Sequence, residues 1–125
     1  MKKSVLTTRE LADLAAKLAD SRKAERITQI DVTGTSDMAD WFVICEGDNF
    51  AHNRAIADAV IDGLKIMKVS VWHAEGLTEG RWIVLDYSDL VVHIMLPDMR
   101  EYYALEELWP KGLRRDIGGG DGNGR

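Results

Sequence analysis

Closely spaced acidic side chains are the first candidates for chemistry in this chain. Asp86 and Asp89 are separated by two residues, Asp37 and Asp40 form a second such pair, and Asp31 lies nearby. Paired carboxylates can hold Mg²⁺ for phosphoryl transfer. The only glycine-rich run lies at the C-terminus and is not followed by a helix, so it is a weak phosphate loop. A metal-dependent enzyme that acts on nucleotides through Asp86 and Asp89 therefore remains an alternative function.

Thiol and imidazole groups give no stronger catalytic signal. Cys45 lies inside an apolar run without a histidine close to it in sequence, and a nucleophile needs a base within hydrogen-bond reach. The histidines His52, His73 and His93 lack the tight spacings that mark zinc sites. We therefore predict no catalytic residue, no cofactor and no metal. A single thiol also favours a reducing, cytoplasmic location.

Composition and charge limit the classes of partner. The chain has 125 residues, 46% of them hydrophobic, which fits one domain at 1–115 and a disordered glycine-rich tail at 116–125. No apolar run approaches the roughly 18 residues that span a bilayer, so no membrane contact is expected. The net charge of −5 disfavours direct nucleic-acid binding. The segment from His73 to Glu107 contains eight acidic and two basic residues, and this excess of negative charge favours a cationic partner.

The periodicity of apolar residues predicts an α+β fold, with an α/β fold built on a mixed sheet as the alternative. Two long amphipathic helices are expected, the first capped by Thr8 and the second by Asp48 or Asn49. A last helix begins after Pro97 and ends at Pro110. Helices and strands then follow the order α-β-β-α-β-β-β-α, with a mixed sheet of about five strands. The expected helices are 8–24, 50–67 and 98–109, and the expected strands are 27–34, 41–47, 69–74, 81–87 and 89–96.

The last two strands are expected to form a tight hairpin that turns at Tyr87 and Ser88. In that register Asp86 faces Asp89 and Trp82 faces His93. Because side chains alternate along a strand, one face carries only core residues, and the other is part apolar and part charged. The core face contains Ile83, Leu85, Leu90, Val92 and Ile94; the other contains Trp82, Val84, Asp86, Asp89, Val91 and His93.

The mixed face indicates an interface. Two carboxylates cannot both be buried without partners, so its turn end must meet water or a partner, and an indole beside acids is typical of an interface centre. Two plainer interpretations stay open, in which Trp82 is an ordinary core aromatic residue and His93 a hydrogen-bonded structural histidine. A slip of one residue in the pairing would exchange the two faces.

Three blocks of the sequence resemble the ribosomal silencing factor (RsfS) family, also called Iojap-like proteins, over roughly residues 8 to 110. They read DVTGTSDMADWFVICEG, AIADAV and GRWIVLDYSDLVVHIMLPDMREYYALEELW. The last block is the most specific, with a tryptophan, an acid-aromatic-small-acid turn, an apolar strand with one histidine, and an acidic helix. The resemblance implies an α+β fold like that of nucleotidyltransferases. The nucleotidyltransferase signature of Gly-Ser followed by Asp-x-Asp is missing, since Asp86 and Asp89 are three apart.

The resemblance also implies a function without catalysis. Members of the family bind the large ribosomal subunit at its fourteenth protein and sterically block joining of the small subunit, which represses translation under nutrient limitation. They form homodimers off the ribosome. The family's contact surface, carried onto this chain, points to Trp82, Asp86 and Tyr87. Hairpin geometry adds Val84, Asp89 and His93, and the acidic helix offers a rim of Tyr102 and Glu106. Because adjacent helical residues face different ways, at least one of Tyr102 and Tyr103 is expected to pack inward.

Overall fold

Six strands form one mixed sheet in this computed structural model, which describes residues 6–35, 37, 39–110 and 113–117. The predicted α+β class and the predicted order of the first eight elements are confirmed. The elements are α1 (Thr8–Ser21), β1 (Glu25–Asp31), β2 (Trp41–Glu46), α2 (Phe50–Ile66), β3 (His73–Glu75), β4 (Trp82–Asp86), β5 (Leu90–Met95), α3 (Pro97–Tyr103), the short 3-10 helix η1 (Leu105–Leu108) and β6 (Arg114–Ile117).

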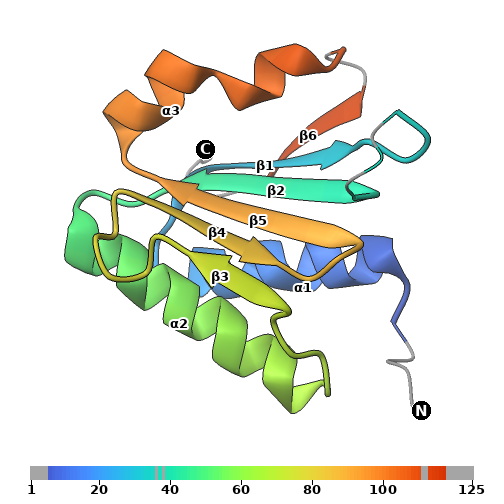
Figure 1. Cartoon of the computed structure of the whole chain (residues 1–125), viewed down its shortest axis with the longest axis horizontal. Coiled ribbons are helices and arrows are strands. Elements are labelled where there is room, and N and C mark those ends of the chain that lie inside the picture. Colours follow the sequence, from blue (N-terminus) through green and yellow to red (C-terminus); the bar gives the residue numbers. More distant parts are fainter. Residues whose placement is uncertain (1–5, 36, 38, 111–112, 118–125) are drawn as a thin grey trace.

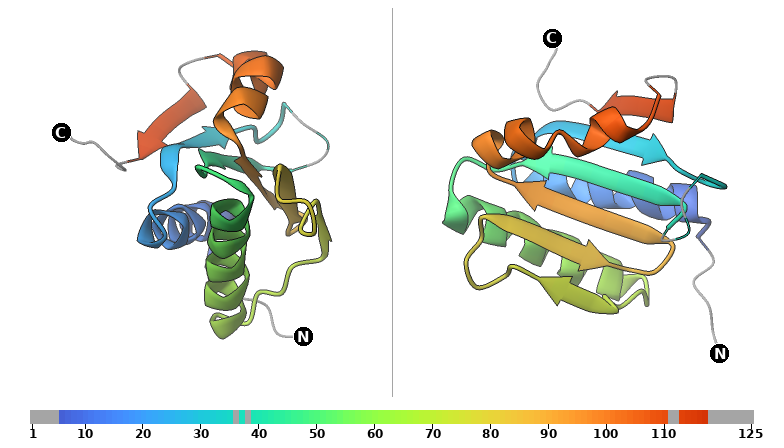
Figure 2. Two further views of the ribbon diagram at one scale, coloured as in Figure 1. Left: turned by 90° about the vertical axis from the view of Figure 1, so that its left-hand side faces the viewer. Right: turned by 45° about the horizontal axis from the view of Figure 1, so that its top comes forward.

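The sheet separates two unequal layers of helix. Its strand order is β3-β4-β5-β2-β1-β6, and only the neighbours β2 and β5 run parallel within the described residues. Helices α1 and α2 cover one face, and α3 with η1 lies on the other (Figure 1). Figure 2 shows α3 and η1 over β1 and β2, whereas β3 and β4 project beyond them. Part of the second face, at β3 and β4, therefore has no helix above it in the part of the chain that the structure describes.

The larger core lies between the sheet and the two long helices. Helix α1 contributes a stripe of small side chains, Ala12, Ala15, Ala16 and Ala19, all almost completely buried. Small residues let α1 approach the sheet closely, so the apolar side chains of β2, β4 and β5 fill the space between the layers. The smaller core, on the α3 side, contains buried Ile30, Val32, Ala39, Phe42, Ile44, Val91 and Met95.

The ends of the first helix differ from the prediction. Thr7, not Thr8, is the N-cap, and it exchanges hydrogen bonds with Glu10 in a capping box. The helix ends at Ser21 rather than at residue 24, because Lys23 adopts a left-handed backbone with φ of 63°. The amide of Ala24 then bonds to the carbonyl of Ala19, which completes a Schellman motif. Because this position is a lysine and not a glycine, the sequence does not indicate that the helix ends here.

The C-terminal part of the chain also departs from the prediction. The single helix expected at 98–109 is broken at Ala104, whose φ of 43° separates α3 from η1. The strand expected at 69–74 is reduced to the three residues of β3. Strand β6 was not predicted, and it pairs antiparallel with β1. The expected domain boundary at 115 falls inside β6, and residues 118–125 of the expected tail lie outside the described residues.

Candidate functional site

The hairpin of β4 and β5 is confirmed, but its predicted register is wrong by two residues. Trp82 pairs with Met95 and Asp86 with Val91, rather than with His93 and Asp89. The turn is longer than expected, with Ser88 in a left-handed conformation (φ 77°) and the amide of Tyr87 bonded to the carbonyl of Leu90. Because side chains alternate with a period of two, this shift keeps every residue within β4 and β5 on its predicted face, whereas Asp89, expected in the strand, lies in the turn.

The hairpin presents one buried face and one half-exposed face. Along β4, Ile83 and Leu85 are fully buried against α1 and α2, whereas the three residues between and beside them are only partly buried. On the same side as those three, β5 contributes a partly buried His93. We call the resulting surface the open face and define it as Trp82, Val84, Asp86, His93 and the neighbouring Tyr103.

Trp82 is the centre of the open face. Its indole Nε1–H donates a hydrogen bond to Nδ1 of His93 at 3.1 Å, a diagonal contact across the hairpin. Its ring also packs against Tyr103 of α3, with a centroid separation of 4.8 Å. The indole is neither a fully buried core residue nor a free surface residue. These contacts hold the indole in one orientation, so the side chain loses less conformational entropy when a partner binds.

His93 serves as a neutral hydrogen-bond acceptor in this arrangement. Its Nδ1 accepts the indole proton, so the ring proton belongs on Nε2. The ring meets Phe42 edge-on at 5.6 Å. Desolvation by burial lowers the pKa of His93 from 6.5 to about 4. The structural interpretation of this histidine is therefore supported, although it lies at the predicted site.

The depressed pKa of His93 makes stability depend on pH. The unfolded chain binds this proton below about pH 6.5 and the folded chain only near pH 4, so stability falls as the pH drops through that window. We expect the free energy of unfolding to fall by about 2 kcal/mol more in the wild type than in His93→Gln between pH 7.5 and pH 5. Glutamine can still accept the indole hydrogen bond but does not titrate. Urea denaturation at both pH values measures the difference, and identical pH dependence in the two proteins would contradict it.

The two acids of the turn are held separately. Asp86 is partly buried and accepts a hydrogen bond from the amide of Ser88 at 2.8 Å. Asp89 is exposed, and its backbone carbonyl accepts bonds from the amides of Asp40 and Trp41, which fixes the turn against β2. Asp86 therefore lies partly exposed on the open face, and Asp89 lies exposed at the turn next to it. They provide negative charge there without a cationic neighbour among the ion pairs of the described residues.

Two predicted contact residues are buried, which corrects their expected exposure. Tyr87 is 9% exposed and packs into the helix-side core, where burial raises its pKa to about 12. Glu106 is 8% exposed and its carboxylate pairs with Arg100 at 3.1 Å. Tyr102, in contrast, is 81% exposed, and its ring meets that of Tyr103 edge-on at 4.9 Å. The expectation that one of the two tyrosines packs inward is wrong, because Tyr103 is also exposed, at 49%. Sequence reasoning left Tyr103 out of the site, although its ring packs on Trp82.

The groups considered for catalysis do not converge. Cys45 is fully buried, and burial raises the pKa of its thiol to about 12. His52 links the amide of Asp48 to the carbonyl of Arg22, and exposed His73 pairs with Glu75. Among the described residues, no three His, Cys, Asp or Glu side chains are placed to hold a metal ion. No helix in the described part of the chain is long and apolar enough to cross a membrane.

Comparison with known proteins gives a consistent result. A family model described as ribosomal silencing factor during starvation matches residues 5–121. The ribosomal silencing factor RsfS of Bacillus subtilis strain 168 is 35% identical over 112 residues, which are 90% of this chain and 95% of that protein. A crystal structure of a Chromobacterium violaceum protein matches with a TM-score of 0.81 and 31% identity, covering 83% of this chain and 87% of that one.

A more distant relative comes from a eukaryote. The mouse protein named mitochondrial assembly of ribosomal large subunit protein 1 is 31% identical over 100 residues, which are 78% of this chain and 44% of that protein. The fold and the match to the family model define the class of this protein as a ribosomal silencing factor. The chain belongs to the RsfS family of ribosomal silencing factors.

Proposed function

We propose that this chain binds the large ribosomal subunit through the open face and prevents the small subunit from joining. The partner on the large subunit is its fourteenth protein, which offers a basic surface. Binding represses translation when nutrients are limiting. The action is steric and not catalytic, takes place in the cytoplasm, and needs little direct contact with nucleic acid.

The observation that carries the proposal is a partly exposed indole on an uncovered part of the sheet. Trp82 and Tyr103 present aromatic surface next to half-buried Val84. Large aromatic side chains near the centre of a patch supply most of the binding energy in protein interfaces. Among the described residues, no helix lies over β3 and β4 on this side (Figure 2). Tyr103 covers the indole only in part, so a partner can reach it without rearranging the fold.

The charge around the open face favours a basic partner. Of the eight acids between His73 and Glu107, only Glu106 is buried. Of the two basic residues in that segment, Arg100 is buried and paired, which leaves Arg81 at the surface. Outside the buried pair, seven acids remain against one basic residue, so the whole excess of six negative charges in this segment lies outside that pair. Complementary charge speeds association and selects the partner, although it adds less to affinity than the aromatic anchor does.

Co-sedimentation with purified ribosomal subunits tests the proposal. We expect the protein to pellet with isolated large subunits and to lower the yield of joined ribosomes when small subunits are added afterwards. The same protein should not remain on ribosomes that are already joined. Higher salt should weaken the binding because charge steers the association. A folded protein that never pellets with large subunits would refute the proposed function.

The same face also suits self-association off the ribosome. We propose that homodimers form through the open face, since an exposed aromatic patch is covered in that way. Analytical ultracentrifugation with and without large subunits separates the two uses of the face. A shared interface requires that dimers dissociate when large subunits are added, whereas a dimer that persists on the subunit would place the self-contact elsewhere.

A further inference from the structure

Helix α3 carries part of the open face but is too short to hold itself in place. It has seven residues and no side-chain cap at its N-terminus. Isolated helices shorter than about 12 residues are marginal in water. The position of Tyr103 beside Trp82 must therefore depend on side chains that fasten α3 and η1 to the sheet.

Apolar contacts provide one part of that attachment. Met99, Leu105 and Trp109 pack on the smaller core, and Trp109 meets Phe42 edge-on at 5.0 Å. These contacts bury surface but have little directionality, because the hydrophobic effect depends mainly on area. They hold the segment on the sheet without fixing the rotation of α3, which decides whether Tyr103 meets Trp82.

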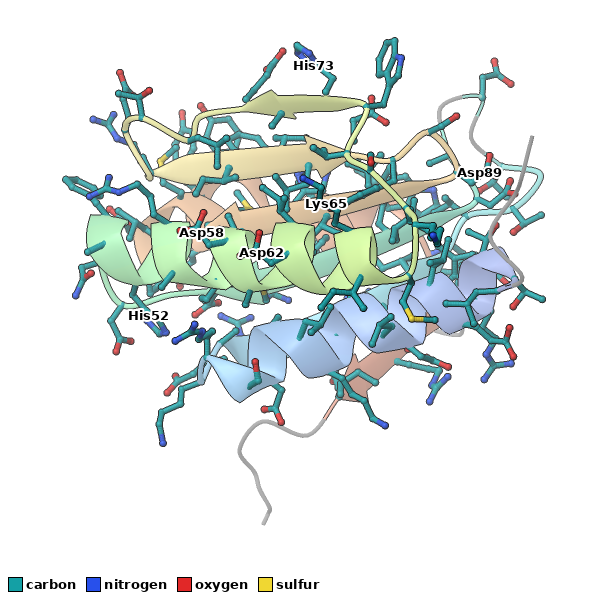
Figure 3. The ribbon with its side chains drawn as sticks, turned by 90° about the horizontal axis from the view of Figure 1, so that it is seen from below. His52, Asp58, Asp62, Lys65, His73 and Asp89 are labelled. Carbon is teal, nitrogen blue, oxygen red and sulfur yellow. The ribbon has the colours of Figure 1, made fainter. Side chains whose placement is uncertain are left out.

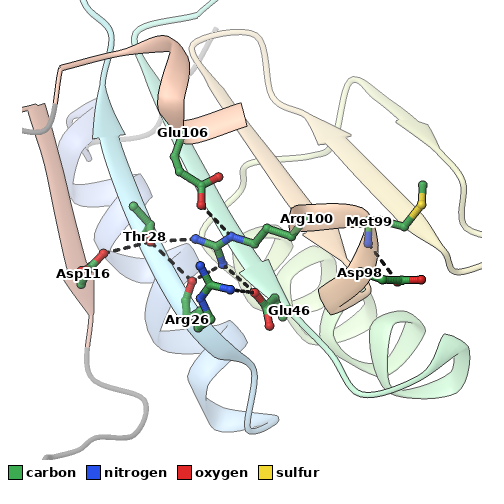
Figure 4. A network of polar contacts seen from close by, with 8 residues as sticks. All are labelled: Arg26, Thr28, Glu46, Asp98, Met99, Arg100, Glu106 and Asp116. Atoms are coloured by element: carbon green, nitrogen blue, oxygen red, sulfur yellow. Dashed lines mark hydrogen bonds and ion pairs between the residues drawn. The ribbon is translucent and has the colours of Figure 1, made fainter. Parts of the chain in front are cut away.

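Arg100 provides the directional part. Its guanidinium is 2% exposed and donates hydrogen bonds to Glu106 of η1 at 3.1 Å, to the hydroxyl of Thr28 at 2.9 Å, and to the backbone carbonyl of Arg26 (Figure 4). It also lies 3.7 Å from the carboxylate of Glu46 in β2. A planar guanidinium with five donors fixes orientation in a way that a single ammonium cannot. One side chain thus joins α3, η1, β1 and β2.

The structure of β1 fits this role. The register of β1 against β2 shifts between Glu25 and Thr28, and Arg26 has a left-handed backbone with φ of 49°. This irregularity lies where the carbonyl of Arg26 accepts the bond from Arg100. Thr28 in turn donates to Asp116 of β6 at 3.0 Å, so the unpredicted strand completes the same network.

A cavity of about 280 Å³ adjoins the network, but the charged residues that line it do not favour binding of an anion. Three arginines line it, Arg26, Arg100 and Arg114, together with the acids Glu106, Glu107 and Asp116. The opposing charges pair with one another, with Arg26 bound to Glu46 at 3.0 Å and Arg114 near Glu107 at 3.8 Å. The arginines are therefore used for internal attachment and are not free to hold a ligand.

We propose that Arg100 is the positioning residue of the open face: its hydrogen bonds orient α3 so that Tyr103 packs on Trp82 in the arrangement that docks on the ribosomal partner. The statement about docking rests on the function proposed above. The statement about orientation concerns this chain alone and can be tested without the ribosome. Glu106, predicted as a contact residue, acts within this attachment instead.

The experiment uses a double variant that carries both Arg100→Met and Glu106→Gln, and compares it with the wild type. The double change removes both charges of the buried pair, keeps side chains of similar length, and leaves Glu46 paired with Arg26. Leu64→Ala is the matched control, because Leu64 is fully buried on the opposite side of the sheet and its truncation lowers stability without touching α3. Two quantities are measured under conditions in which all three proteins are folded.

The first quantity is the nuclear Overhauser effect between the rings of Trp82 and Tyr103, and the second is the dissociation constant for large subunits. In the double variant we expect the ring contact to be lost and binding to weaken at least about tenfold. The control should keep both. A ring contact that survives in the double variant overturns the role in orientation. A lost contact with unchanged affinity overturns the role in docking. If the wild type does not bind large subunits, the proposed function fails, and the ring contact alone still decides whether Arg100 orients α3.

Discussion

Trp82→Ala combined with Asp86→Lys is expected to weaken binding to large ribosomal subunits by at least a hundredfold. Removal of a central indole from an interface typically costs about 2–4 kcal/mol, which alone lowers affinity about thirtyfold or more. Asp86→Lys replaces a carboxylate near the indole by an ammonium group, so that a basic partner is repelled where it was attracted. The two changes lie on the same face of β4, with Val84 between them. Co-sedimentation over a range of subunit concentrations measures the loss.

The matched control reverses the same charge on the other side of the molecule. Asp58 is exposed on α2, and Figure 3 shows it on the outward side of that helix, away from the sheet. Asp58→Lys alters the net charge as much as Asp86→Lys does. It should leave binding within about twofold, because exposed charges farther apart than a Debye length are largely screened at physiological salt. Circular dichroism confirms that each variant is folded. Normal binding by the folded double variant would remove Trp82 and Asp86 from the proposed interface.

Gly76→Ala is expected to lower the free energy of unfolding by about 3 kcal/mol. Gly76 has a φ of +79° in the loop between β3 and β4, and a Cβ there would lie 2.1 Å from the backbone carbonyl oxygen of Trp82. A left-handed backbone costs an alanine about 1 kcal/mol, and the overlap with a backbone atom adds about 2 kcal/mol because the strand itself must move. The change acts on the residue that carries the central indole. Thermal unfolding should show a fall in Tm of roughly 10 °C.

Gly34→Ala isolates the conformational part of that effect. Gly34 has the same φ of +79°, but a Cβ added there would meet no atom within 4 Å. The expected loss is therefore only about 1 kcal/mol, the cost of the left-handed backbone. Equal losses in the two variants would mean that the loop after β3 yields to the added methyl group, so the close approach to Trp82 would not be a constraint on the fold.

The two faces of the hairpin follow from the sequence because they depend on a local period. Side chains alternate in direction along Trp82–Asp86, so charged Asp86 shares a face with Trp82 and Val84. Ile83 and Leu85 then lie on the opposite, core face whichever even register the strands adopt. The register itself does not follow, since it depends on a turn in which Ser88 takes a left-handed backbone without being glycine. The predicted partner of Trp82 was therefore wrong, although its face was right.

Residues at turns and chain ends are harder to assign from sequence. Tyr87 lies in the turn, where alternation no longer applies, and it folds back into the helix-side core. The ends of α1 and α2 are set by left-handed Lys23 and Lys68, which carry none of the usual glycine signal. Strand β6 has little apolar pattern, because Arg114, Arg115 and Asp116 interrupt it, and it is a strand through its pairing with β1.

The sequence by itself determined the α+β class, the faces of the strands, the acidic character of the segment from His73 to Glu107 and membership of the RsfS family, because each of these depends on a short-range pattern or on residue identity. Only the tertiary structure decided that Trp82 bonds diagonally to His93, that Glu106 is turned inward, and that Arg100 fastens α3 to the sheet. Those contacts join residues that are up to 74 positions apart. Their geometry depends on how whole elements pack, and local sequence patterns do not determine it.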